Sequence, residues 1–190
     1  QVYLAEHDVV AELTPTERAA AFRLTYPEKE MSYLVVDAYS GGNAEVLSDK
    51  NMIVGYSTAN HGGVTENFRN WFVVVSDTPF ETQTVDGHIA MVGFKTVKGQ
   101  KVNLKVASSF ISQEQAELNL NELSGRSFDE IAEAGRARWN EVLGRIAVED
   151  DNLDNLRTFY SCLYRSVLFP RDLSSQLDGT PFYERQGVAE

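Results

Sequence analysis

A short acidic stretch, Glu149 to Asn155 ("EDDNLDN"), gathers the kind of oxygen atoms that could bind a divalent cation. Ca²⁺ prefers clustered carboxylates and carbonyls, but a calcium-binding loop spaces them as Asp-x-Asp-x-Asp-Gly with a glutamate at its end. This stretch lacks that spacing. An aspartate or asparagine at 150–152 fits better as the cap of a following helix, with the other acids at the positively polarised helix end. We therefore expect helix capping here and no metal site.

The sequence contains three histidines, His7, His61 and His88. None of them lies in a metal-binding pattern such as His-Glu-x-x-His. His61 stands out because it lies in the glycine-rich stretch "TANHGGVTENF", which also contains Glu66. Loops of this kind often carry functional residues. The same glycines are also what a plain turn requires. Both interpretations stay open, and His61 and Glu66 remain candidates for ligand contact.

Possible nucleophiles and paired carboxylates give no clear catalytic centre. Ser161 and Cys162 lack a Gly-x-Ser-x-Gly context, and Cys162 lies in an apolar helix, where a thiol is usually inert core. Glycoside hydrolysis needs two carboxyl groups across a pocket. Asp8 and Glu12 share one face of a predicted strand, but their spacing does not distinguish them from ordinary solvent-facing acids.

Aromatic side chains in predicted strands could stack on sugar rings. The candidates are Tyr39, Tyr56, Trp71 and Phe72. Because strands of this alternation place most of their aromatics in the core, we expect the majority to be buried. Trp71 is kept as a candidate for sugar contact.

Composition excludes several classes of function. The 190 residues carry a formal net charge of −11 without a basic run, so nucleic acid is not an expected partner. No apolar run reaches the length of about 18 residues that a membrane helix needs, and we expect no membrane insertion. The residues from Gln1 onward show no basic segment followed by an apolar stretch, so we expect no signal peptide within this sequence, and one cysteine leaves no internal disulfide.

The elements that must position these residues change character along the chain. Residues 1–111 contain short β-branched and aromatic runs separated by Gly, Asp and Pro turn signals, which predicts an antiparallel β-sandwich in a mainly β fold. Residues 112–125 are polar and partly helical. Ser127 and Glu130 form a capping box before an apolar face that predicts a helix to about Ile146. A second helix ends at Pro170, and the tail after Arg171 is predicted to be a loop.

That second helix, "TFYSCLYRSVLFPR" from Thr158 to Arg171, is apolar around most of its circumference. A helix of this kind is normally buried on several sides, and this one is too short and too polar at Arg165 and Ser166 to span a bilayer. The sequence therefore predicts that other helices surround it.

Five segments, in this order, resemble glycoside hydrolase family 92, the calcium-dependent exo-acting α-mannosidases. The resemblance covers about residues 2–171 and fades after Arg171. The segments are "VVAELTPTERAAAFRLTYP" (9–27), "IVGYSTANHGGVTENFRNWFVVVSDTPF" (53–80), "LKVASSFISQEQAELNLNEL" (104–123), "ARWNEVLGRIAVED" (137–150) and "LRTFYSCLYRSVLFPR" (156–171).

The resemblance implies an architecture. Members of the family have an N-terminal β-sandwich, a helical linker and an (α/α)6 barrel. Residues 1–111 would then be the sandwich, incomplete at its start, 112–150 the helical linker, and 151–190 the start of the catalytic domain. The family's opening strands and the remaining barrel helices are expected elsewhere on the polypeptide.

The resemblance also implies a function, the inverting hydrolysis of terminal α-mannose from N-glycan-type substrates. The catalytic carboxylates and calcium ligands of the family lie in the barrel, so this chain is expected to hold no catalytic residue and no metal. Its expected partners are mannose-containing glycans and the rest of the same polypeptide, with His61, Glu66 and Trp71 at the substrate rim. The family implies a periplasmic, cell-surface or secreted location.

Two alternatives remain. The chain could be a stand-alone carbohydrate-binding sandwich in which Tyr56 and Trp71 form a sugar platform. It could also be a structural module that dimerises through its exposed helix.

Overall fold

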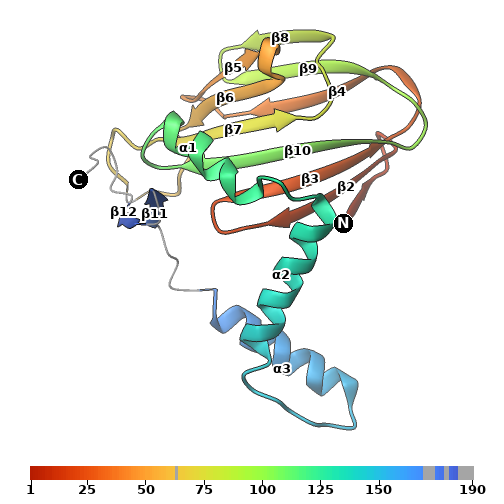
Figure 1. The fold of residues 1–190 in the computed structure, drawn as a ribbon, viewed down its shortest axis with the longest axis vertical. Helices are drawn as coiled ribbons and strands as arrows, with labels where there is room; N and C mark the ends of the chain where they lie inside the picture. Colours follow the sequence, from red (N-terminus) through yellow and green to blue (C-terminus); the bar gives the residue numbers. More distant parts are fainter. Residues whose placement is uncertain (63, 169–173, 178–179, 184–190) are drawn as a thin grey trace.

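The computed structural model describes residues 1–62, 64–168, 174–177 and 180–183, and within them residues 1–109 form strands as predicted (Figure 1). All strand pairings are antiparallel. The expected β-sandwich followed by helices is confirmed. Its strands are β1 (Val2–Leu4), β2 (Val9–Pro15), β3 (Ala19–Tyr26), β4 (Lys29–Asp37), β5 (Asn43–Leu47), β6 (Met52–Ser57), β7 (Asn70–Ser76), β8 (Thr82–Asp86), β9 (Ile89–Thr96) and β10 (Gln100–Ser109).

The sandwich consists of two sheets of unequal width. The larger has the order β1-β2-β3-β10-β7-β6-β5, and the smaller has the order β4-β9-β8. Apolar side chains from both sheets meet between them, among them Ile53, Val92, Phe94 and Val102, each at most 1% exposed. The alternation of apolar and polar residues in β10 produces this burial, since Val102 and Leu104 point inward while Asn103 and Lys105 point outward.

Helical elements cover the outer face of the larger sheet. They are α1 (Gln113–Asn119), the 3-10 helix η2 (Leu120–Leu123) and the start of α2 (Phe128–Leu143). The chain then continues into α3 (Leu153–Ser166). A separate short 3-10 helix, η1 (Ser48–Lys50), lies between β5 and β6. On the outer face of the larger sheet, Val73 packs with Ala116, Leu123 and Ile131 in a second core. α1 lies across the sheet, whereas α2 and α3 extend away from it (Figure 1).

Helix α2 begins at the predicted capping box. The Ser127 hydroxyl accepts from the Glu130 N–H, and the Glu130 carboxylate accepts from the Ser127 N–H. Only Ile131 of the helix is buried, because α2 runs beyond the sheet that its first turns contact. Trp139, further along the same apolar face, is therefore 36% exposed.

Helix α3 has an apolar surface that the described residues leave uncovered. None of its residues is buried, and Leu153 is 64% exposed. The helix meets α2 where the rings of Trp139 and Tyr164 lie 4.7 Å apart. The expectation that Cys162 is core is wrong for the described chain, since its thiol is exposed on α3.

The prediction that the tail after Arg171 is a loop is wrong for two segments. β11 (Ser174–Leu177) and β12 (Thr180–Tyr183) form a two-stranded antiparallel sheet. The Asp-Gly dipeptide between them in the sequence is a strong hairpin signal that outweighs the lack of apolar alternation. The predicted helix stop at Pro170 lies outside the described residues.

Candidate functional site

The glycine-rich loop that connects β6 to β7 holds two of the three predicted rim residues. Its turns are fixed locally, because the Asn60 side chain accepts from the Gly62 N–H at 2.7 Å and Gly62 adopts a φ of 93°. This left-handed conformation favours glycine, which supports the turn interpretation of the motif. His61 and Glu66 are exposed on this loop and make no hydrogen bond or ion pair with other described residues.

Trp71, the third predicted rim residue, lies on β7 and is half-buried. It pairs across the strands with Tyr56, and the two ring centroids are 4.9 Å apart at an interplanar angle of 64°. The Arg69 guanidinium lies 4.9 Å from the centroid of the Tyr56 ring. Trp71 also packs against the outer core beneath α1. The edge-on contact gives each ring a packing role and does not form the flat open platform that a stand-alone sugar-binding module would need.

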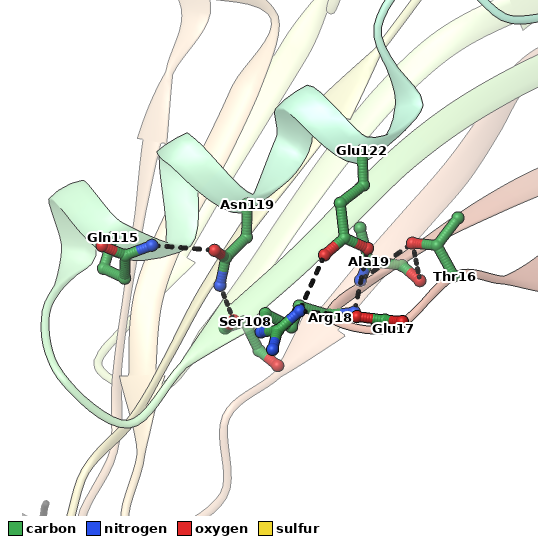
Figure 2. A network of polar contacts seen from close by, with 8 residues as sticks. All are labelled: Thr16, Glu17, Arg18, Ala19, Ser108, Gln115, Asn119 and Glu122. Atoms are coloured by element: carbon green, nitrogen blue, oxygen red, sulfur yellow. Dashed lines mark hydrogen bonds and ion pairs between the residues drawn. The ribbon is translucent and has the colours of Figure 1, made fainter. Parts of the chain in front are cut away.

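A groove of about 770 Å³ lies between the β2–β3 turn, η2 and α2. Figure 2 shows the polar network at its edge. The Arg18 N–H donates to Glu122 Oε2 at 3.0 Å, and Arg18 Nη1 donates to Glu122 Oε1 at 3.4 Å and to Glu17 Oε2 at 2.9 Å. Beside it, Gln115 Nε2 donates to Asn119 Oδ1, and Asn119 Nδ2 donates to the Ser108 carbonyl, both at 2.9 Å.

This network joins elements that are distant in sequence. Arg18 lies in the β2–β3 turn, and Glu122 lies on η2, 104 residues later. Both oxygens of Glu122 accept from Arg18, so its carboxylate is held as an ionic brace and is not presented to a substrate. Sequence reasoning missed the pair because no local pattern links residues so far apart.

A second brace connects the larger sheet to α2. Arg23 on β3 donates to Glu12 Oε2 at 2.7 Å and to Asp129 Oδ1 at 2.8 Å, and its guanidinium lies 4.2 Å from the centroid of the Phe128 ring. The hydrogen bond from Arg23 lowers the pKa of Glu12. The expectation of a solvent-facing Glu12 is therefore wrong. The prediction that Asp8 and Glu12 share one face of a strand is also wrong. Asp8 lies before β2, in a turn where its φ is 56°.

No cation site forms from the carboxylates, histidines and cysteine that the structure describes, since no three or more of them gather as ligands. In the acidic stretch, Asp150 accepts from the Asn152 N–H and the Asn155 amide, which lowers the pKa of Asp150. Asn152 caps α3 by accepting from the Asp154 N–H. The capping interpretation is confirmed.

The arrangement of a sandwich, a helical linker and an uncovered helix can be compared with known families. Residues 1–121 match the model described as "Glycosyl hydrolase family 92 N-terminal domain". The chain belongs to glycoside hydrolase family 92. The family 92 catalytic-domain model matches residues 115–189, so the catalytic region of the family includes α2, α3 and the β11–β12 hairpin.

Solved structures of family 92 share this fold. An inverting mannosidase of the family from Bacteroides thetaiotaomicron superposes with a TM-score of 0.87 and 36% identity, covering 94% of this chain and 27% of that one. Another family 92 glycosyl hydrolase superposes with a TM-score of 0.76 and 25% identity, covering 87% of this chain and 25% of that one.

A sequence relative adds a further comparison. An uncharacterized secreted glycosidase of Arthroderma benhamiae is 31% identical over 81 residues, which are 40% of this chain and 10% of that protein. The chain thus spans about a quarter of the solved family 92 structures and a smaller part of this relative. Among the described residues, no helix is long and apolar enough to cross a membrane.

Proposed function

We propose that this chain is the sandwich and first helical part of an exo-acting α-mannosidase, which releases terminal α-mannose from N-glycan-type substrates with inversion. The observation that carries the proposal is the superposition with an inverting mannosidase at 36% identity over 94% of the chain. Release of mannose from α-mannobiose by the full-length polypeptide tests it.

The reacting carboxyl groups belong to the remainder of the polypeptide. An inverting glycosidase needs one carboxylic acid to protonate the leaving oxygen and one carboxylate, about 6.5–9.5 Å away, to activate a water molecule on the opposite face of the sugar. The best-placed carboxylates of the groove do not fit these roles. Glu17 and Glu122 are both bound to Arg18 at the surface of a bracing network.

The role of this chain is to position the catalytic domain. The Arg18–Glu122 and Arg23–Asp129 contacts fix η2 and α2 on the sheet. From that anchor α2 and α3 project outward, and α3 presents an uncovered apolar surface to the rest of the same polypeptide. Burying that surface stabilises the assembly by about 25 cal/mol for each Å² removed from water.

We also infer that the whole polypeptide binds calcium and is exported, by analogy with the family. We propose that the calcium ligands lie in the remainder of the polypeptide; among the described residues, no three or more His, Cys, Asp or Glu side chains gather as ligands. Export to the periplasm, the cell surface or the medium is supported by the relative described as secreted.

We propose that the exposed loop between β6 and β7 lies at the substrate rim. His61 and Glu66 are exposed on this loop, and Trp71 packs against Tyr56 at its base. In the full-length enzyme, His61→Ala and Glu66→Ala should each lower kcat/KM on α-mannobiose about 10-fold, since each removes one polar contact worth about 1.4 kcal/mol. Thermal unfolding should be unchanged, because both side chains are exposed.

His7→Ala is the matched control for the rim. His7 is equally exposed but lies before β2, away from the β6–β7 loop. His7→Ala should leave kcat/KM unchanged. If the kcat/KM values of His61→Ala and Glu66→Ala equal that of His7→Ala, the loop does not contact substrate.

A further inference from the structure

The smaller sheet has an outer face on the opposite side of the sandwich from α1 and the start of α2, which pack on the larger sheet. Leu34 and Val36 of β4 and Val92 of β9 pack in the core between the sheets. Because successive residues of a strand point to opposite faces, the residues that alternate with these three point outward. Strand pairing sets the outward residues in three rows that cross from β4 over β9 to β8: Tyr33–Gly93–Thr82, Val35–Met91–Thr84 and Asp37–Ile89–Asp86. We call them the outer rows.

A tyrosine lies over the middle strand of this face, where a glycine makes room for it. A Cβ atom at Gly93 would lie 3.2 Å from Tyr33 Cε1 and 2.7 Å from Met31 Sδ, so these two side chains occupy the space that a larger residue would fill. Gly93 is buried, whereas Tyr33 is 52% exposed. One part of the tyrosine ring therefore packs on the sheet, and the rest is open to solvent.

The chemistry around the tyrosine ring has an apolar centre and a polar border. In the centre, Val35 is 55% exposed next to Tyr33 in the outer rows. The border consists of exposed hydroxyl and carboxylate groups, which belong to Thr82, Thr84, Asp37 and Asp86. A pyranose ring has the matching two kinds of surface. Its C–H groups pack on an aromatic ring, and the hydroxyls at its edge donate to and accept from side-chain oxygens.

We propose that the outer rows bind a neutral glycan, with a pyranose ring packed on Tyr33 and its hydroxyl groups hydrogen-bonded to Thr82 and Thr84. The choice of mannose as the sugar rests on the proposed function. The residues differ from those of the β6–β7 loop and from the Tyr56–Trp71 pair, which lie on the larger sheet. Because the tyrosine already rests on Gly93, little side-chain ordering opposes binding.

The size and charge of this face favour a glycan over a protein partner. A stable protein–protein interface takes about 20–30 residues from each side. The outer rows offer three rows of three residues. Two copies of this chain, each with a formal net charge of −11, also repel one another on approach. A neutral sugar needs neither a large area nor a charge of opposite sign.

Affinity electrophoresis of the full-length protein in gels that contain soluble α-mannan tests the proposal. Tyr33→Ala should weaken the apparent affinity about 10-fold, because one aromatic contact is lost. Thr84→Val keeps the side-chain shape but removes a hydroxyl, and it should weaken the affinity about 3-fold. Tyr33→Phe keeps the ring and should be retarded as strongly as the unsubstituted protein. Tyr3→Ala is the matched control, since Tyr3 is 58% exposed on β1 of the other sheet.

The result that would overturn the proposal is equal retardation of Tyr33→Ala, Tyr33→Phe and Tyr3→Ala. Self-association that Tyr33→Ala abolishes, measured by light scattering, would also overturn it, because the face would then join two copies. If Tyr33→Ala does not fold, Tyr33→Leu replaces it, since leucine keeps an apolar contact over Gly93. A full-length protein that releases no mannose but is retarded through Tyr33 would contradict the proposed function and support the glycan site.

Discussion

Replacing Gly55 with alanine will destabilise the sandwich severely. A Cβ atom at Gly55 would lie 2.0 Å from the Asn43 carbonyl oxygen and 2.9 Å from Cζ of Phe72. Gly55 is buried in β6 between β5 and β7, and the nearest obstacle is backbone that cannot rotate away. Overpacking of this kind costs typically 1–3 kcal/mol, and we expect about 3 kcal/mol or more here because two strands must separate.

The measurement is thermal or denaturant unfolding of the variant, with Gly135→Ala as the matched control. A Cβ at Gly135 would meet Thr14 Oγ1 at 3.8 Å and the Pro15 carbonyl oxygen at 4.0 Å, which are ordinary contacts. Because Gly135 lies inside α2, alanine should stabilise the protein by up to about 1 kcal/mol through helix propensity. If both variants unfold at the same midpoint, the close strand approach at Gly55 is not as described.

The second large effect concerns Cys162. Its thiol is exposed on α3, so in the isolated polypeptide of residues 1–190 it should react with a maleimide at the rate of an unhindered cysteine. In the full-length protein we expect the rate to fall at least about 100-fold, because the catalytic domain covers α3 and the thiol reacts only on local opening. Mass spectrometry of the peptide that contains Cys162 measures both rates.

A cysteine on the sandwich gives the control for this comparison. Lys98 lies exposed in the turn between β9 and β10, on the other side of the molecule from α3 in Figure 1. Lys98→Cys should react equally fast in the two polypeptides. Equal rates for Cys162 as well would mean that the rest of the protein leaves α3 uncovered.

The strands and helix starts were predictable from local patterns. Alternation in residues 101–109 predicted β10, and Ser127 with Glu130 predicted the start of α2, because each depends on neighbours in sequence. The bracing contacts were not predictable. Arg23 binds Glu12 through strand pairing and Asp129 across 106 residues, and only the folded chain brings these groups together.

Burial was the weakest part of the prediction. The apolar circumference of α3 predicted surrounding helices, which stays a prediction, and it also predicted a buried Cys162, whose thiol is exposed among the described residues. For the predicted rim residues, the sequence indicated exposure but not the binding partner. The sequence placed His61 and Glu66 on a loop, where the structure shows both side chains exposed, and their contact with substrate stays a prediction.

The central claim is that residues 1–190 carry a scaffold and that the reacting carboxylates lie elsewhere in the same polypeptide. The most direct test is mannose release from α-mannobiose, measured for the purified, folded chain of residues 1–190 and for the full-length protein, each with calcium present. We predict turnover with inversion by the full-length protein and none above background by residues 1–190. Turnover by residues 1–190 at a rate similar to that of the full-length protein would contradict the claim.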